Sequence, residues 1–285
     1  MKILITGAAG MLGADLQEAL PPKHQLVLTD ITGNVISLDI TDEKRVSAVM
    51  AEHRPDLVIH AAAYTDVDGC ERDPDRAFLI NGEGTRNVAA ACRLFDAALL
   101  YISTDFVFDG EKREPYTEND VPNPINHYGA SKLAGENCVR ELCPSHYIVR
   151  TAWLYGEHGK NFPLNILNAA KSKKELKVVA DQIGSPTFTA DLAPAIRDLI
   201  ESRVYGAYHI TNKGFCSWYE FAKKTLSFAG INDVEIKPIK SEEWSSLTPR
   251  PKYSVLGRLA LERQGKDNMR SWEEALQDFV SRLDI

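Results

Sequence analysis

Two tyrosine–lysine pairs have a spacing that acid–base chemistry can use. Residues 128–132 read YGASK, so Tyr128 stands four residues before Lys132. On a helix, side chains at this spacing lie one turn apart on the same face, where a phenol can donate a proton and an ammonium group can tune its pKa. The same spacing recurs at Tyr219 and Lys223. Spacing alone therefore does not decide whether either pair is catalytic or lies on an ordinary surface.

The segment YISTDFVFDG carries polar side chains where a predicted strand ends. Ser103, Thr104 and Asp105 follow an apolar run. In open α/β sheets, the carboxyl ends of the strands face the ligand crevice. The first tyrosine–lysine pair follows about one loop later, and the second pair lacks this context. We therefore predict that the first pair belongs to the site and that the second pair takes part in packing.

A glycine-rich turn lies near the start of the chain. Gly7, Gly10 and Gly13 stand between a predicted strand and a predicted helix. Glycines let the backbone turn tightly and approach a pyrophosphate, and the N-terminus of the following helix offers free N–H groups. Met11 and Leu12 follow, so no cation stands close behind the glycines. The pattern predicts dinucleotide binding, and the alternative is a turn with only a packing role.

The next predicted strand, residues 25–30, ends at a carboxylate. Asp30 can bind the adenosine ribose hydroxyls and repel a 2′-phosphate, or it can simply cap a turn. Asp39 and Ile40 follow the third predicted strand, where they can contact adenine. Charge alone favours NADH, or the use of both cofactors.

The elements that position these residues alternate along the first half of the chain. Such alternation implies βαβ units, a parallel sheet and helices on both faces. The predicted strands are 2–6, 25–30, 34–39, 55–63, 98–105 and the start of 146–156, and the predicted helices are 11–20, 42–53, 74–96 and 129–142.

After about residue 150 the alternation loosens. Helical patterns at 162–173, 190–202, 217–230 and 271–283, with short strands between them, predict a smaller mixed lobe. We expect an α/β protein with a Rossmann-type, doubly wound parallel sheet. Residues 1–150 are the expected NAD(P)-binding domain, and 151–285 are mainly a substrate-binding lobe with segments that return to the sheet.

Composition argues against several classes of partner. The 285 residues carry a formal net charge of −7 and no basic stripe, which disfavours nucleic acid. No apolar run approaches the roughly 20 residues of a membrane span. The 5 cysteines form no C-x-x-C pattern, so we expect free thiols and a reducing cytoplasm.

The chain resembles the extended short-chain dehydrogenase/reductases, and among them the dTDP-4-dehydrorhamnose reductases. The resemblance spans nearly the whole chain. It rests, in order, on GAAGMLG, HAAAYTDVDGCE, NGEGTRNVA, STDFVFDG, YGASKLAGE, RTAWLYG, DQIGSPT and RPKYSVL. It implies that NADPH, with NADH as an accepted substitute, reduces the C4 keto group of dTDP-4-dehydro-L-rhamnose to dTDP-L-rhamnose.

The resemblance also implies roles for individual residues. Tyr128 is the general acid, Lys132 binds the nicotinamide ribose and lowers the tyrosine pKa, and Thr104 orients the carbonyl oxygen, with Ser103 as its competitor. The cofactor is expected against Ala61, Ala62 and Ala63. The substrate is expected to contact Thr65, Val67, Thr104, Asp105, Phe106, Tyr128, Trp153, Gln182, Pro186, Thr187 and Arg250.

One departure from related dehydratases favours plain reduction. Those enzymes place a glutamate where Phe106 stands, and a phenylalanine cannot act as an acid or a base. The alternatives are another nucleotide-sugar reductase or epimerase, and a regulatory subunit that resembles the partner of methionine adenosyltransferase. Some relatives form a dimer through magnesium bound by C-terminal carboxylates. We do not predict a metal site at Glu273, Glu274 and Asp278, because such residues are common on surface helices. A monomer or a homodimer is expected.

Overall fold

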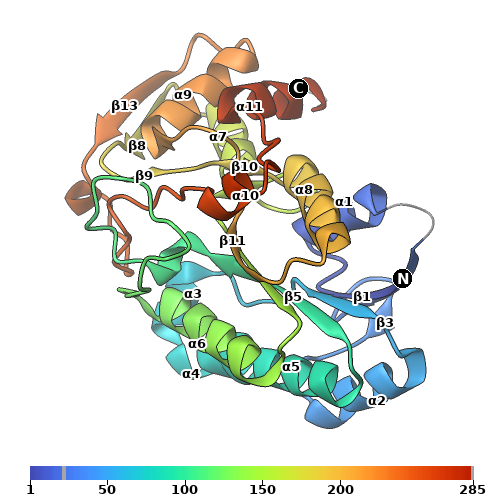
Figure 1. The fold of residues 1–285 in the computed structure, drawn as a ribbon. Helices are drawn as coiled ribbons and strands as arrows, with labels where there is room; N and C mark the ends of the chain where they lie inside the picture. The colour runs from blue at the N-terminus through green and yellow to red at the C-terminus, as the bar shows by residue number, and fades with distance from the viewer. Residues whose placement is uncertain (21–23, 284–285) are drawn as a thin grey trace.

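The protein is built around one parallel sheet (Figure 1). The computed structural model describes residues 1–20 and 24–283. Its main sheet has the strand order β3-β2-β1-β4-β5-β6-β11, and each pairing in it is parallel. The predicted Rossmann-type α/β class is thereby confirmed. The strands are β1 Lys2–Thr6, β2 Gln25–Asp30, β3 Ile36–Ser37, β4 Leu57–His60, β5 Ala98–Thr104, β6 His146–Thr151 and β11 Gly206–His209.

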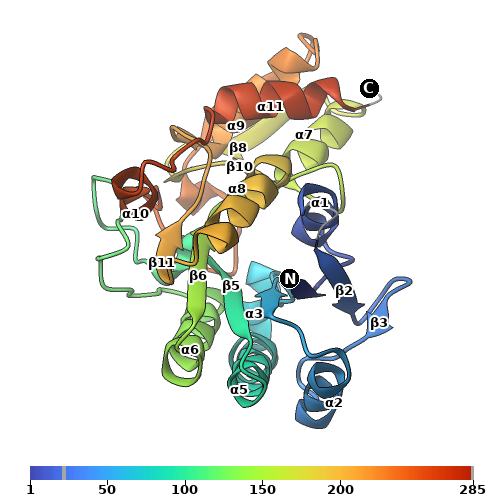
Figure 2. The same ribbon diagram turned by 45° about the vertical axis from the view of Figure 1, so that its right-hand side comes forward.

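Helices cover both faces of this sheet (Figure 2). One face packs against α2 Glu43–His53, α5 Thr85–Leu94 and α6 His127–Leu142. The other face packs against α1 Met11–Ala19 and α8 Thr189–Ser202. Burial on both sides explains why the strands are nearly continuous apolar runs.

The predicted helix 74–96 is one helical run with an irregular centre. It consists of α4 Pro74–Ala77, the π-helical η1 Phe78–Gly84 and then α5. The Asn81 side chain accepts from the Tyr64 amide at 2.8 Å, and its amide group donates to the Tyr64 carbonyl and the Ser131 hydroxyl, each at 3.0 Å. The wide turn thus ties the loop after β4 to α6, as π-helical turns often do near functional sites.

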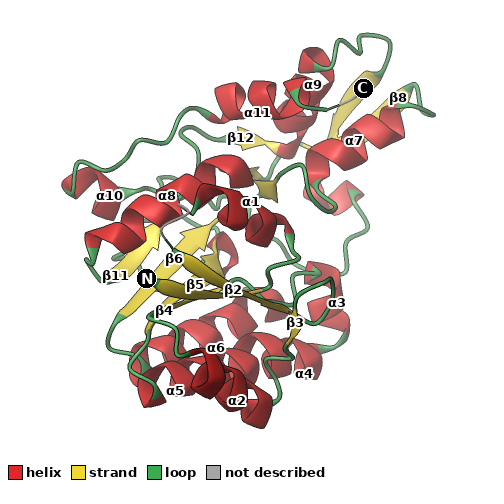
Figure 3. Ribbon diagram, turned by 90° about the vertical axis from the view of Figure 1, so that its right-hand side faces the viewer, coloured by secondary structure: helices red, strands yellow, loops and turns green. Residues whose placement is uncertain are grey.

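A smaller lobe stands beyond the carboxyl edge of the sheet (Figure 3). Its β8 and β13 pair in parallel and pack against helices around an aromatic core. Its elements are β7 Leu154–Tyr155, α7 Phe162–Ala170, β8 Glu175–Val179, β9 Ile183–Gly184, β10 Thr187–Phe188, β12 Cys216–Ser217, α9 Trp218–Phe228, β13 Glu235–Ile239 and α11 Trp272–Ser281. The shorter elements elsewhere are α3 Val67–Arg72, η2 Asp105–Val107, η3 Ser241–Glu243 and α10 Leu259–Arg263.

The chain returns to the main sheet after it has entered this lobe. Strand β11 pairs with β6, and α8 lies beside α1. The boundary near residue 150 therefore stays a prediction. The five cysteines are free, as expected. Within residues 1–20 and 24–283, we find no helix with the length and apolar character that a membrane crossing requires.

Candidate active site

The glycine turn forms a backbone cradle at the end of β1. Gly7 has a φ of 72°, and a Cβ on it would lie 2.6 Å from the backbone nitrogen of Ala62. A Cβ on Gly13 would overlap the Gly7 carbonyl. Helix α1 begins after Gly10 with no side-chain cap, so its first N–H groups can serve an anion. These features fit the pyrophosphate of a dinucleotide.

Asp30 lies beside this cradle and also caps a turn. One carboxylate oxygen accepts from the Ala9 amide at 3.1 Å, and the other accepts from the amide and hydroxyl of Thr32. Asp39 is exposed, whereas Ile40 is buried. Both expectations for Asp30 are therefore compatible with its geometry.

Tyr128 and Thr104 meet above the carboxyl end of β5. The Thr104 hydroxyl lies close enough to the Tyr128 phenol to lower the pKa of that phenol. The Phe106 ring meets the Tyr128 ring edge-on, with centroids 5.5 Å apart. A Cβ on Gly129 would overlap the Phe106 carbonyl, so the glycine of YGASK lets α6 approach this strand end. Lys132 follows one turn later on the same helix.

The two competing assignments separate in space. The Ser103 hydroxyl donates to Glu136 at 2.6 Å inside the protein, so Thr104 is the hydroxyl that meets the phenol. Tyr219 and Lys223 lie on α9 in the small lobe. Geometry thus favours Thr104 over Ser103, and the first tyrosine–lysine pair over the second.

Burial shifts the pKa values of Tyr128 and Lys132. It lowers the pKa of Lys132 to about 7, and the ammonium donates to the Ile102 carbonyl at 2.7 Å, over the Tyr101 ring. Burial raises the pKa of Tyr128, and the hydrogen bond from Thr104 opposes that rise. Because the Lys132 ammonium faces the Ile102 carbonyl in this structure, its expected effect on the tyrosine pKa stays a prediction.

His60 is a packed histidine, as its position after an apolar strand suggests. It is fully buried, with one ring nitrogen 2.7 Å from the Thr6 hydroxyl and the other 3.1 Å from that of Thr85. Burial, with a further contribution from Lys132, lowers its pKa to about 3. It therefore remains neutral and links β1, β4 and α5 beneath the site.

A segment of the second half of the chain crosses to the carboxyl end of β5. We call residues 246–256 the strap. The guanidinium of Arg250, the residue expected to bind the diphosphate, lies 3.3 Å from the Asp68 carboxylate and forms an ion pair with it. The Pro249 carbonyl accepts from the Asn126 side chain, and the Ser254 hydroxyl donates to Asp105 at 2.6 Å.

The remaining predicted substrate residues lie around this cluster or inside the lobe. Trp153 adopts a φ of 48° and stacks on Trp218 with ring centroids 3.4 Å apart. Pro186 and Thr187 are buried, so their contact with substrate stays a prediction. Thr65 is exposed; Val67, Ala61, Ala62, Ala63 and Met11 are half-buried; Gln182, which donates to Ser241, and Leu12 are buried.

Several residues of this site were not predicted as functional. Asn81, Glu136 and Ser254 lie in motifs that we noted only for their resemblance. Their roles depend on partners distant in sequence, and Ser254 meets Asp105 across 149 residues. The sequence signal that could have indicated these roles is a polar side chain within an apolar segment, because a buried polar group requires a hydrogen-bond partner.

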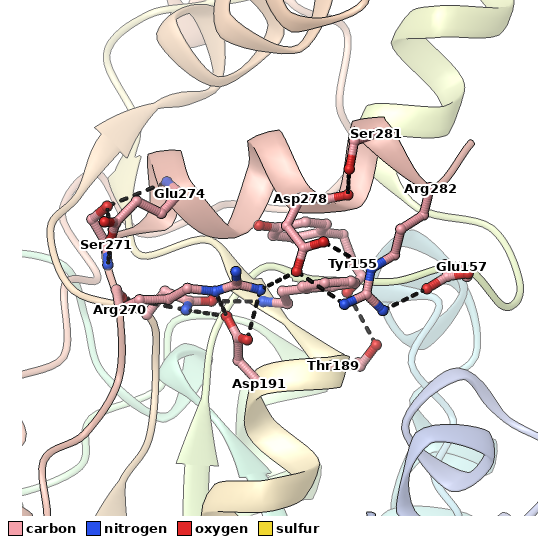
Figure 4. A network of polar contacts seen from close by, with 12 residues as sticks. Tyr155, Glu157, Thr189, Asp191, Arg270, Ser271, Glu274, Asp278, Ser281 and Arg282 are labelled. Atoms are coloured by element: carbon pink, nitrogen blue, oxygen red, sulfur yellow. Dashed lines mark hydrogen bonds and ion pairs between the residues drawn. The ribbon is translucent and has the colours of Figure 1, made fainter. Parts of the chain in front are cut away.

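The C-terminal carboxylates have protein partners (Figure 4). Glu274 accepts from Ser271, and Asp278 accepts from Arg270 and Arg282. Across residues 1–20 and 24–283, no group of three or more His, Cys, Asp or Glu side chains is arranged to hold a metal ion. The absence of a metal remains an expectation.

Comparison with known proteins identifies the family. Residues 1–285 match the model of the family described as RmlD substrate binding domain. The chain belongs to this family. A dTDP-4-keto-6-deoxy-D-glucose reductase of Streptomyces niveus shares 42% identity with the chain, over 96% of this chain and 94% of that protein.

Solved structures agree with the RmlD assignment. The dTDP-4-dehydrorhamnose reductase of Bacillus anthracis in complex with NADP has a TM-score of 0.95 and 47% identity, and 99% of each chain is covered. A dTDP-4-dehydrorhamnose reductase of Clostridium acetobutylicum has a TM-score of 0.96 and 46% identity over 100% of both chains. The resemblance inferred from the motifs is therefore confirmed at the level of family and fold.

Proposed function

We propose that this protein reduces the C4 keto group of dTDP-4-dehydro-L-rhamnose to dTDP-L-rhamnose, the last step of dTDP-rhamnose biosynthesis. One observation carries the proposal: Tyr128 and Thr104, with the buried Lys132 one turn along α6, lie at the same carboxyl edge of the sheet as the dinucleotide cradle. The chain also aligns over 98% of its length with a dTDP-4-dehydrorhamnose reductase of Streptomyces griseus. We also propose a cytoplasmic enzyme that acts as a monomer or a homodimer.

Each side chain of the site has a separate role in the proposed reduction. NADPH, when bound, supplies the hydride to the sugar C4. Tyr128 gives its proton to the C4 oxygen, so that a ketone becomes an alcohol. Thr104 orients the same oxygen, and Lys132 is placed one turn along α6 to hold the nicotinamide ribose. The Phe106 ring packs against Tyr128 and supplies no second acid or base, which favours reduction over elimination.

We propose NADPH as the cofactor, with NADH accepted. The relative from Bacillus anthracis binds NADP. The Asp30 carboxylate beside the glycine cradle adds negative charge where a 2′-phosphate would approach, and this charge favours NADH. The ratio of the two rates measures which effect is larger.

The test is stoichiometric oxidation of NADPH, and of NADH in parallel, upon addition of dTDP-4-dehydrorhamnose. Tyr128→Phe is expected to bind cofactor normally and to lose at least about a hundredfold in kcat. Tyr219→Phe, in the lobe helix with the same lysine spacing, is the matched control and should keep its activity. Full turnover in Tyr128→Phe would contradict the proposal. Catalysis without net oxidation of cofactor would indicate an epimerase instead.

A further inference from the structure

A buried carboxylate lies directly behind the catalytic hydroxyl. Asp105 is only 2% exposed. One of its oxygens lies 3.0 Å from the Thr104 hydroxyl, and the other accepts from the Ser254 hydroxyl at 2.6 Å. Both oxygens thus have protein partners, and the expected contact of Asp105 with substrate stays a prediction.

The groups that face Asp105 are hydroxyls and backbone amides. They are the side chains of Thr104 and Ser254, the N–H groups of Asp105 and Phe106, and the Tyr128 phenol, whose pKa the carboxylate raises. Burial is the largest effect on Asp105 itself and raises its pKa to about 6, although the hydrogen bonds oppose the rise. The carboxyl group therefore changes charge close to neutral pH.

Thr104 cannot serve all of its neighbours at once. A hydroxyl has one proton to donate and two lone pairs with which to accept. The Phe106 amide donates to it at 3.2 Å. If the Thr104 proton points to an ionised Asp105, none remains for the Tyr128 phenol or for a carbonyl oxygen. If Asp105 is neutral, it donates to Thr104, and the Thr104 proton is free to turn toward the reacting oxygen.

We propose that Asp105 is a positioning residue whose neutral form turns the Thr104 hydroxyl into a hydrogen-bond donor toward the reacting oxygen. The inference rests on the proposed reductase function. Hydride arrival at C4 builds negative charge on the carbonyl oxygen, and a donor aimed at that charge lowers the barrier. Ser254 donates to the far oxygen and thus leaves the carboxyl proton on the side that faces Thr104.

The first test is the pH dependence of kcat at saturating substrate and cofactor. In the wild type, kcat should fall by about tenfold as pH rises through the Asp105 pKa, because one donor is lost. Asp105→Asn keeps a permanent N–H donor toward Thr104, so the part of the fall that belongs to Asp105 should be absent. Loss of the Lys132 charge, whose pKa is about 7, lowers kcat in both proteins, so the wild type should begin to fall about one pH unit below Asp105→Asn. Identical pH profiles of kcat in the two proteins would overturn the proposal.

A second variant keeps the test decisive if Asp105→Asn folds poorly. Ser254→Ala removes a hydrogen bond that stabilises the ionised carboxylate, which raises the pKa of Asp105 further. The fall in kcat should therefore shift to higher pH. A purely structural role for Ser254 would change the level of activity without shifting this transition, and that result would count against the proposal.

A direct titration separates this inference from the proposed function. The carboxyl carbon of Asp105, assigned by its absence in Asp105→Asn, can be followed by ¹³C NMR in the protein without substrate. Titration near 6 in a protein that turns over no keto sugar would leave the carboxyl assignment intact and refute the reductase. Titration near the ordinary value of 3.8 would overturn the inference even in an active enzyme.

Discussion

The sharpest stability prediction concerns the ion pair beneath the catalytic helix. Glu136 lies on α6 one turn beyond Lys132, and its side chain is fully buried. It accepts from Ser103 at 2.6 Å, from two nitrogens of Arg150 at 2.8 and 2.7 Å, and from Arg140 at 2.8 Å. The Arg150 side chain is 2% exposed, so neither charge has water to replace its partner.

Glu136→Gln should therefore destabilise the protein strongly. It leaves the Arg150 guanidinium buried without a counter-charge, and breaking a buried pair in this way costs about 3–5 kcal/mol. Arg150→Met should cost less, since Arg140 still pairs with Glu136. Arg140→Ala is the matched control: its side chain is 38% exposed, and an exposed ion pair contributes at most about 1 kcal/mol.

The assay is urea unfolding at neutral and acid pH without ligands. The contacts with Arg150 and Ser103 hold the pKa of Glu136 below its ordinary 4.5. Its stabilising contribution is therefore present above that value and lost as pH falls through the lower folded pKa. The difference in the free energy of unfolding between wild type and Glu136→Gln should become smaller at acid pH. A loss below about 1 kcal/mol at neutral pH, or an equal loss in Arg140→Ala, would refute the reasoning.

Three further perturbations follow from the geometry. Gly7→Ala should weaken NADPH binding by about tenfold or more in a fluorescence titration, because the new Cβ meets the backbone of Ala62 at a φ of 72°. Gly184→Ala should displace Trp153, whose ring the Cβ would overlap, and near-UV circular dichroism and a lower Tm would report a cost of about 1–3 kcal/mol. Asp105→Asn should raise the free energy of unfolding in urea by about 2 kcal/mol more at pH 8 than at pH 4, because the carboxyl pKa rises from 3.8 to about 6 on folding and the ionised carboxylate costs stability at high pH. No gain at pH 8 would contradict the assigned pKa.

The sequence predicted features whose cause is local. The glycine turn follows a strand and opens a helix within a few residues, so its pattern alone indicates the cradle. The helix predicted at 129–142 is α6, which begins two residues earlier, at His127, because the Asn126 side chain caps it. The alternation of strands and helices predicted a parallel sheet for the same reason.

Features that depend on distant partners could not be predicted. Hydrophobic periodicity does not reveal the π-helical turn at Asn81. The Asn81 side chain forms its hydrogen bonds with Tyr64 and Ser131, which lie far away in the sequence. No residue near Asp105 in the sequence indicates that the Ser254 hydroxyl donates a hydrogen bond to its carboxylate. The orientation of the Lys132 ammonium likewise depends on the tertiary packing of α6 against β5.

The late return of the chain to the sheet has a consequence for biosynthesis. Strand β6 is covered at its edge by β11, and the layer over α1 includes Leu192 of α8, Leu261 and Met269. A nascent chain therefore shows an unpaired edge of β6 until residues 206–209 have emerged from the ribosome, and an incompletely covered apolar face until Met269 has emerged. Such surfaces promote misassociation. We expect the nucleotide-binding half to complete its fold only after these later segments have been made, and its partly made forms to be clients of chaperones.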